Sequence, residues 1–172
     1  IIFDALGAAG TATSGEGVIY TGGTTTLSGT VTANGFTKFG TGTLALTGTA
    51  AIIGSAGTNG LNIQDGTLQI GANTRLVSLV TAVNVNLGAT LDLNGNNLVV
   101  GSLNNAFNNS GGVIGNSSTT TAASLTINGN AASGWTGRIV DAVGAGTQTT
   151  ALNKMGTGTL TLAATRIDSP ES

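Results

Sequence analysis

The chain has 172 residues, of which 40% are hydrophobic, 7% are charged and 3% are aromatic. This apolar content with so little charge excludes an intrinsically disordered chain, and five scattered basic residues at a net charge of −2 leave no nucleic-acid footprint. The absence of cysteine and histidine excludes disulfides and thiolate metal sites and removes the commonest general base.

The fold class follows from the residue types that are common and those that are rare. Thr, Val and Ile are plentiful, Glu, Lys, Gln and Arg are scarce, and there are 29 glycines and one proline. We therefore expect an all-β chain. Its longest apolar stretch, residues 76–87, contains polar interruptions and is too short to span a bilayer, so we expect no membrane insertion.

Short strands are predicted along the whole chain, each marked by two aliphatic residues on either side of a small or polar one. In chain order these are Leu44–Leu46, Leu61–Ile63, Leu68–Ile70, Val83–Val85, Leu91–Leu93, Leu125–Ile127 and Leu160–Leu162. Alternate side chains of a strand face opposite sides, so the aliphatic pair should point inward. The residues expected to point outward are Ala45, Asn62, Gln69, Asn84, Asp92, Thr126 and Thr161. Residues 76–80 break this alternation and either turn a corner or are covered on both faces.

Regular spacing of the strands predicts an architecture of stacked coils. Gly or Asn follows most strands, at Gly48, Gly71, Gly88, Asn94-Gly95 and Asn128-Gly129, where tight bends favour these residues. The triplets Gly42-Thr43-Leu44, Gly66-Thr67-Leu68 and Ala89-Thr90-Leu91 are 24 and 23 residues apart. We expect a three-sided β-solenoid of about seven coils with about 23 residues each, roughly 35 Å tall.

An alternative all-β fold is a hairpin-built sandwich or barrel. The Asn-Gly pairs at 34–35, 59–60, 94–95 and 128–129 would suit hairpin turns. The even spacing of similar strands and the scarcity of aromatic residues favour the solenoid instead. We expect one domain over 1–172, with an N-terminal coil or edge segment at 1–23, a repeat region at 24–164 and a polar tail at 165–172.

A long segment of the sequence occurs twice. Residues 36–48 return as residues 152–164, and the lysine, the Gly-Thr-Gly-Thr tetrapeptide and the Leu-x-Leu pair keep their spacing in both copies. Lys38 and Lys154 are 116 residues apart. Repetition over a long period is typical of an architecture built from similar stacked units.

This series of motifs resembles the autotransporter-associated β-strand repeat of bacterial autotransporter passenger domains. The segments that carry the resemblance are Leu27–Val31, Lys38–Leu46, Asp65–Ile70, Gly88–Asn97, Gly101–Leu103, Gly111–Ile114, Ser124–Gly129 and Trp135–Ile139. It covers roughly residues 24–164. The resemblance implies a right-handed, single-stranded parallel β-helix that is exported to the bacterial surface or released. The family shares no active site, so it supplies no catalytic residue for this chain.

Two acidic residues are the first candidates for chemistry. Asp92-Leu93-Asn94-Gly95-Asn96 imitates the start of a calcium loop, but Asn97 and Leu103 stand where an EF-hand needs Gly and Glu. Asp65 and Asp92 lie about one coil apart and would form a carboxylate pair of the kind glycosidases use if they approached each other. The simpler interpretation, which we favour, is that both are solvated surface residues.

The remaining candidates also have structural interpretations. Trp135 would suit a sugar-stacking platform, but it aligns with Leu27 in the repeat and is expected to cap or pack the core. Lys38 and Lys154 beside glycine-rich bends are expected to be positional, and the Gly-Thr-Gly-Thr runs lack the Walker pattern. Glycosylation sequons occur at 108–110 and 116–118 and carry little weight in a bacterial protein.

The sequence thus predicts a structural protein and no enzyme, with no catalytic, cofactor or metal-binding residue. The favoured role is a rigid scaffold or adhesive stalk, outside the cell or on the bacterial surface, with a host-surface or matrix ligand as an expected partner. The alternative is a filament or sheath subunit that self-associates head to tail or laterally, because solenoid ends need a cap. A polysaccharide-binding or polysaccharide-cleaving β-helix is the third possibility.

Overall fold

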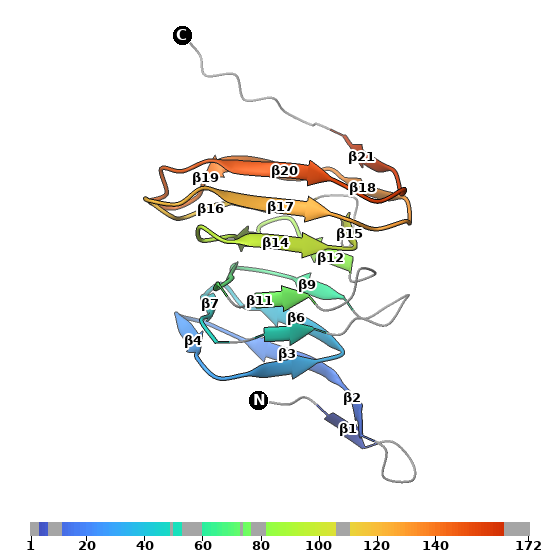
Figure 1. The fold of residues 1–172 in the computed structure, drawn as a ribbon. Helices are drawn as coiled ribbons and strands as arrows, with labels where there is room; N and C mark the ends of the chain where they lie inside the picture. Colours follow the sequence, from blue (N-terminus) through green and yellow to red (C-terminus); the bar gives the residue numbers. More distant parts are fainter. Residues whose placement is uncertain are drawn as a thin grey trace.

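A computed structural model describes residues 4–6, 12–48, 50–52, 60–72, 74–76, 82–105 and 111–163. Within these ranges the chain forms short β-strands and no helix, and almost all strand pairs are parallel (Figure 1). From β3 onward, each strand pairs with or lies against the strand three places later in the chain, so the chain passes through three faces in turn and then begins the next coil. The expected three-sided β-solenoid is therefore confirmed, and a hairpin-built sandwich is ruled out.

The first face is the longest column of strands. It contains β3 (Glu16–Tyr20), β6 (Gly35–Phe39), β9 (Leu61–Ile63), β12 (Ala82–Val85), β15 (Ser102–Asn104), β18 (Ser133–Trp135) and β21 (Leu160–Leu162). Strands β3 to β15 form one parallel sheet, β18 lies against β15, and β18 pairs with β21.

The second face is one continuous sheet of six strands. They are β4 (Thr25–Leu27), β7 (Thr43–Leu46), β10 (Thr67–Gln69), β13 (Thr90–Asp92), β16 (Val113–Asn116) and β19 (Arg138–Ala142). Thr67 pairs with Thr43 on one side and with Thr90 on the other, so the three Thr-Leu triplets stack as their spacing predicts.

The third face contains two groups of three strands. They are β5 (Val31–Ala33), β8 (Ala50–Ile52) and β11 (Thr74–Leu76), then β14 (Asn97–Val100), β17 (Ala123–Ile127) and β20 (Thr150–Lys154). Strand β14 lies against β11, which joins the two groups into one face. The irregular stretch at 76–80 begins with the last residue of β11, and its remaining residues lie outside the described part of the chain.

The number of coils is smaller than the expected seven. The N-terminal strands β1 (Asp4–Leu6) and β2 (Ala12–Ser14) pair antiparallel with each other instead of forming a coil, and the longest continuous sheet has six strands. The coils also differ in length, because paired residues are 19 apart between β3 and β6 but 27 apart between β17 and β20. The sequence spacing of 23 therefore holds for the middle of the second face and fails elsewhere.

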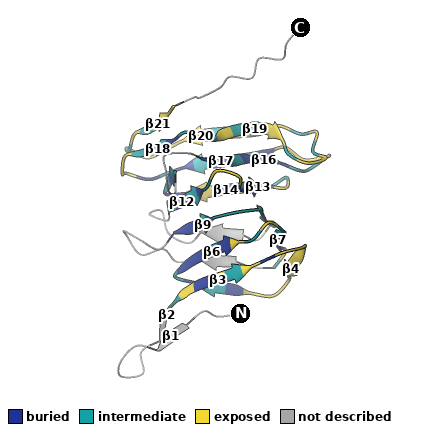
Figure 2. Cartoon of the chain, turned by 180° about the vertical axis from the view of Figure 1, so that it is seen from behind, coloured by how far each residue is buried: buried dark blue, intermediate teal, exposed yellow. Residues whose placement is uncertain are grey.

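Aliphatic side chains fill the interior along the axis. Figure 2 shows that buried residues occur in strands from coil to coil along the stack. Leu44, Leu68, Leu91 and Ile114 stack on the inner side of the second face, and each is 0% exposed. All seven predicted aliphatic pairs lie in or beside strands, but Leu162 in β21 is 51% exposed. Strand β21 pairs on one edge with β18, and no other described strand covers its second edge.

Two kinds of constraint explain the glycines and asparagines at the bends. Gly88 and Asn94 have φ values of 87° and 46°, the left-handed conformation expected of a tight bend. Gly129 has no such φ, but a Cβ there would lie 1.9 Å from the carbonyl oxygen of Gly101 in the coil below. Close contact between coils, and not backbone conformation, therefore requires glycine at 129.

The duplicated segment does not return to the same face. Lys38 is the last inward-facing residue of β6 on the first face, whereas Lys154 belongs to β20 on the third face. Strand β20 comes fourteen strands after β6, which is not a multiple of the three strands in each coil. The second copy of the segment therefore begins one strand earlier in its coil and is turned by one face around the axis.

Candidate functional site

The outward side of the first face carries a column of side chains that continues from coil to coil and is hydrogen-bonding at all but its first position. The column consists of Val18, Thr37, Asn62, Asn84 and Asn104, which are paired in register on β3, β6, β9, β12 and β15. Asn84 Nδ2 donates to Asn62 Oδ1 at 2.7 Å, and Asn62 Nδ2 donates to Thr37 Oγ1 at 3.3 Å. Stacking places identical amides one strand spacing apart, which satisfies part of each amide and leaves its second N–H outside this ladder.

A second outward column on the same face joins two aromatic residues to two amides. Its members are Tyr20, Phe39, Gln64 and Asn86. The rings of Tyr20 and Phe39 meet edge to face, with centroids 5.2 Å apart and planes at 66°. The two amides belong to the next two coils, and Asn86 Nδ2 donates a hydrogen bond to Gln64 Oε1. We call the two columns together the amide face.

Tyr20 is the most exposed aromatic side chain of the described residues, at 66%. Its ring lies over the backbone at Gly40, where an added Cβ would come within 2.8 Å of Cε2. One side of the ring is thus supported by glycine and by the edge of Phe39, and the rest is open to solvent. Such a fixed and exposed ring has the form of a binding platform, which sequence reasoning missed because nothing in the pattern distinguished outward aromatics from inward ones.

Lys38 lies under this face with its side chain inside the solenoid. It occupies the inward position between Ile19 and Ile63 and is 0% exposed. Its Nζ donates to the carbonyl oxygens of Gly40 at 2.5 Å, Gly42 at 2.7 Å and Asp65 at 2.7 Å. The ammonium thus ties the bend after β6 to the same bend one coil later.

Burial sets the electrostatics of Lys38. Removal of the ammonium from water lowers the pKa of Lys38 below its ordinary value of 10.5, and the nearby negative charge of Asp65 opposes this shift. The second lysine of the repeat is in a different setting. Lys154 is exposed, and its Nζ donates to the carbonyl oxygens of Met155 and Gly156 in its own bend. The expectation that these lysines are positional agrees with their bonding to backbone carbonyls.

Asp92 is buried, so the expectation that it faces solvent is wrong. It is 3% exposed, and Oδ1 accepts hydrogen bonds from the backbone N–H groups of Asn94 and Ser117, both at 2.9 Å. Oδ2 accepts from Gln69 Nε2 at 2.8 Å. The carboxylate therefore organises two neighbouring bends of the backbone. Ala45, which was expected to point outward, is also buried at 6% exposure and lies in register between Thr26 and Gln69.

The structure does not bring Asp65 and Asp92 together. In the register of β10 and β13, Asp92 pairs with Gln69, four residues after Asp65. Asp65 lies in the bend between β9 and β10, and its Oδ1 accepts from the N–H of Gly66 at 2.7 Å. The carboxylate pair that a glycosidase would need is therefore not formed by these residues.

Asn116 belongs to the same bend network as Asp92. It is 0% exposed, its Oδ1 accepts from the N–H groups of Gly95 at 2.8 Å and Ser118 at 3.0 Å, and its Nδ2 donates to the carbonyl of Thr121 at 2.9 Å. A buried amide with these bonds is not an acceptor for a glycan. The other sequon, at 108–110, lies outside the described residues.

Trp135 packs in the core and offers no ring surface for stacking on a sugar. It is 2% exposed, and added Cβ atoms at Gly111 and Gly137 would collide with its ring. Its Nε1 is buried without a hydrogen-bond partner. The interpretation of Trp135 as a core residue is confirmed.

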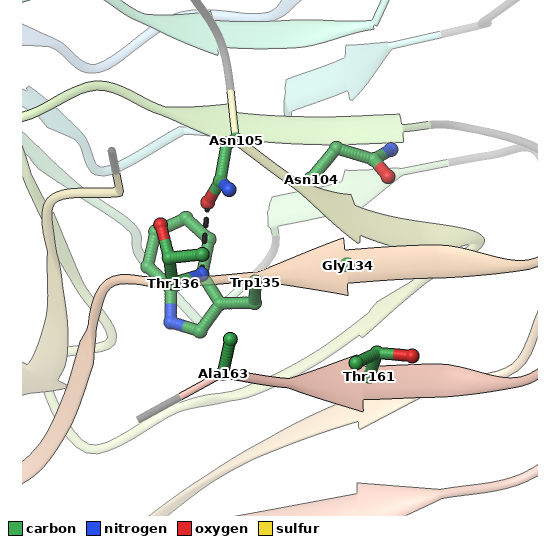
Figure 3. A pocket seen from close by; sticks show the side chains of 7 residues that line it. All are labelled: Asn104, Asn105, Gly134, Trp135, Thr136, Thr161 and Ala163. Carbon is green, nitrogen blue, oxygen red and sulfur yellow. Dashed lines mark hydrogen bonds between the residues drawn. The ribbon is translucent and has the colours of Figure 1, made fainter. Parts of the chain in front are cut away.

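A shallow depression of about 310 Å³ opens beside Trp135 on the first face (Figure 3). It is lined by Asn104, Asn105, Gly134, Trp135, Thr136, Thr161 and Ala163. Gly134 contributes no side chain, and an added Cβ there would meet nothing within 4 Å. The Oδ1 of Asn105 accepts from the Thr136 N–H at 2.9 Å, which fixes one wall. Because Asn104 belongs to both, the amide face leads into this depression.

No family model matches the chain. Comparisons with curated proteins and with solved structures give no match either. The described residues contain no helix that is long and apolar enough to cross a membrane. They also contain no group of three or more acidic side chains placed to hold a metal ion. The features that distinguish the molecule are thus its buried polar network and its amide face.

Proposed function

We propose that this chain is a structural, non-catalytic β-solenoid segment of a secreted or surface-displayed bacterial protein, acting as a rigid scaffold or adhesive stalk. The proposal is carried by the hydrogen bonds that the buried polar side chains make to the backbone. Lys38, Asp92 and Asn116 each bind backbone groups in more than one bend, and each has its polar atoms occupied by these bonds. Groups committed in this way brace the stack and are not available for proton transfer or nucleophilic attack.

Bracing of this kind suits a load-bearing element. The continuous aliphatic column stabilises each coil through its neighbours, and the backbone ladders run along the axis across several strands. Bends tied by Lys38 and Asp92 limit local opening, where a solenoid would otherwise fray first. A stiff and protease-resistant rod is the expected physical behaviour.

Force spectroscopy on the chain held between two marker domains tests this role. We expect resistance to extension followed by stepwise release of coils, and early release in a variant with Asp92→Ala. Smooth extension at low force, like that of a flexible linker, would contradict a scaffold. Immunogold labelling of thin sections of the source organism tests surface display separately, and label confined to the cytoplasm would contradict it.

A filament subunit is the second candidate function. Exposed apolar side chains near β20 and β21 favour it, since Met155 is 57% and Leu162 is 51% exposed. A second copy stacking there would cover both residues through a head-to-tail contact. Negative-stain microscopy distinguishes the two, because fibres with a subunit repeat support the filament and persistent monomers support an isolated scaffold.

A further inference from the structure

We propose that the amide face binds a neutral, linear polysaccharide laid along the solenoid axis, with Tyr20 and Phe39 as its aromatic anchor. This ligand site goes beyond the scaffold role. It rests on three features of the first face: an exposed aromatic pair at one end, an uncharged hydrogen-bonding column in the middle, and a depression at the other end.

The aromatic pair supplies the apolar contact that a sugar ring requires. One side of a pyranose presents C–H groups, which pack on the negative face of an aromatic ring. Tyr20 is held on Gly40 by close contact and against Phe39 by its edge, yet remains 66% exposed. A ring already fixed in place loses little conformational freedom when a ligand covers it.

The amide column supplies hydrogen bonds at a regular interval. Thr37, Asn62 and Asn84 present hydroxyl and amide groups on successive strands, about 4.8 Å apart. This interval is comparable to the length of one sugar unit in an extended chain. Each amide can both donate and accept, as sugar hydroxyls do, so successive units of one chain meet equivalent partners.

The charge of the face selects a neutral ligand. The nine side chains of its two columns include no Lys, Arg, Asp or Glu. The nearest acid along the first column is Glu16, whose carboxylate accepts from Thr37 Oγ1 at 2.5 Å. The ammonium of Lys38 below the face is buried and bonded to carbonyls, so it offers an anionic sugar no contact. An acidic polysaccharide would therefore meet repulsion without a compensating cation.

The depression beside Gly134 gives the path a second end. It lies about 24 Å from β3, at five strand spacings along the axis. Asn104 connects it to the column, and its lining includes Trp135, whose indole N–H is buried without a partner. A sugar hydroxyl in the depression would find amide and hydroxyl partners on Asn104 and Thr161.

The other faces lack this combination in the described part of the chain. On the second face, Gln69 and Asp92 bond to each other and to the bend at Ser117, so the Gln69 N–H groups and the Asp92 carboxylate are already engaged. On the third face, Val99 is 45% exposed but no aromatic ring lies beside it. Val99 is therefore a matched control for an exposed apolar side chain outside the proposed site.

Affinity electrophoresis of the whole chain in native gels tests the anchor. The gels contain hydroxyethyl cellulose or dextran as neutral polymers, or polygalacturonate as an anionic one. We expect a neutral polymer to retard the wild type. Tyr20→Ala should raise the dissociation constant for that polymer about tenfold. Tyr20→Phe and Val99→Ala should behave as wild type. Circular dichroism checks that each variant is folded, and Phe39→Ala replaces Tyr20→Ala if the latter is not.

A second pair of variants tests the axial path. Gly134→Leu places a large side chain in the depression at a position where an added Cβ meets nothing within 4 Å, and Gly29→Leu is a control at a bend with equally open space around the Cβ. We expect Gly134→Leu to weaken binding of the long polymer severalfold while leaving binding of cellotriose at the Tyr20 end, measured by titration calorimetry, unchanged, because three sugar units at about 4.8 Å each are too short to reach the depression. Equal binding of the long polymer by wild type and Gly134→Leu would overturn the axial path.

Three results would overturn the site as a whole. They are no retardation by either neutral polymer, retardation by polygalacturonate alone, and equal weakening by Tyr20→Ala and Val99→Ala. None of them would affect the scaffold proposal, which depends on resistance to force. Conversely, a chain that extends at low force but binds a neutral polymer through Tyr20 would retain this site and lose the scaffold role.

Discussion

Replacing Lys38 by methionine is the sharpest test of how the coils are held together. Methionine keeps an apolar stem of similar length in the inward column but removes the ammonium that binds three backbone carbonyls. Each buried carbonyl left without a donor costs about 1–3 kcal/mol, and part of this is recovered because no charge has to be desolvated. We expect a net loss of about 3 kcal/mol in the free energy of unfolding.

Lys154→Met is the matched control, because the same residue of the repeat is exposed and bonded within its own bend. Its free energy of unfolding should change by no more than about 0.5 kcal/mol. Urea denaturation followed by circular dichroism at 25 °C measures both. A Lys38→Met variant as stable as the control, or more stable than wild type, would refute the idea that the ammonium links the two bends.

The pH dependence of the same pair gives an independent check. Burial lowers the pKa of Lys38 in the folded state, so the unfolded chain binds more protons at pH values between the folded pKa and 10.5. The free energy of unfolding of the wild type should therefore rise relative to Lys38→Met as pH increases toward 10.5, and this gain should be lost as pH falls through the folded pKa. A difference that shrinks with increasing pH would contradict a lowered pKa.

Three further changes test the packing, the close approach of coils and the bend network, each by urea denaturation of the whole chain. Leu68→Ala in the fully buried leucine column should cost about 2–5 kcal/mol, whereas Leu87→Ala, at 74% exposure, should change stability by less than about 0.5 kcal/mol. Gly129→Ala should cost at least about 1–3 kcal/mol because its Cβ would meet Gly101 O at 1.9 Å, whereas Gly134→Ala meets nothing; equal effects would contradict the contact argument. Asp92→Ala should cost about 2–3 kcal/mol by leaving two backbone N–H groups and the Gln69 amide without their acceptor, and a neutral result would mean that water replaces the carboxylate.

The stacking of the second face could be predicted from the sequence because identical residues recur at coil length. Thr43, Thr67 and Thr90 mark equivalent points, and hydrophobic packing of Leu44, Leu68 and Leu91 fixes the register between them. The number of coils could not be predicted in this way. Bends of different lengths change the coil from 19 to 27 residues without disturbing the strands, and the antiparallel pairing of β1 with β2 has no counterpart in the repeat.

The site residues were harder to predict because alternation gives the side of a strand but not its surroundings. Asp92 has the parity of an outward residue, yet the bend at Ser117 and the side chain of Gln69 cover it. Lys38 has the parity of an inward residue, and charged side chains rarely occupy inward positions. The recurrence of this lysine at Lys154 was the available signal of a structural role. For Tyr20 the sequence held no comparable signal, since its support comes from Gly40 in the neighbouring coil.

The fourteen-strand offset between Lys38 and Lys154 has a geometric consequence for any protein built from this unit in tandem. Each further unit would turn its equivalent surfaces by one third of a revolution about the axis, so equivalent surfaces would face the same direction again after three units. A sequence duplicated along one line would in this way present its features around the whole circumference of the shaft, and targets approaching from different sides would meet the same chemistry.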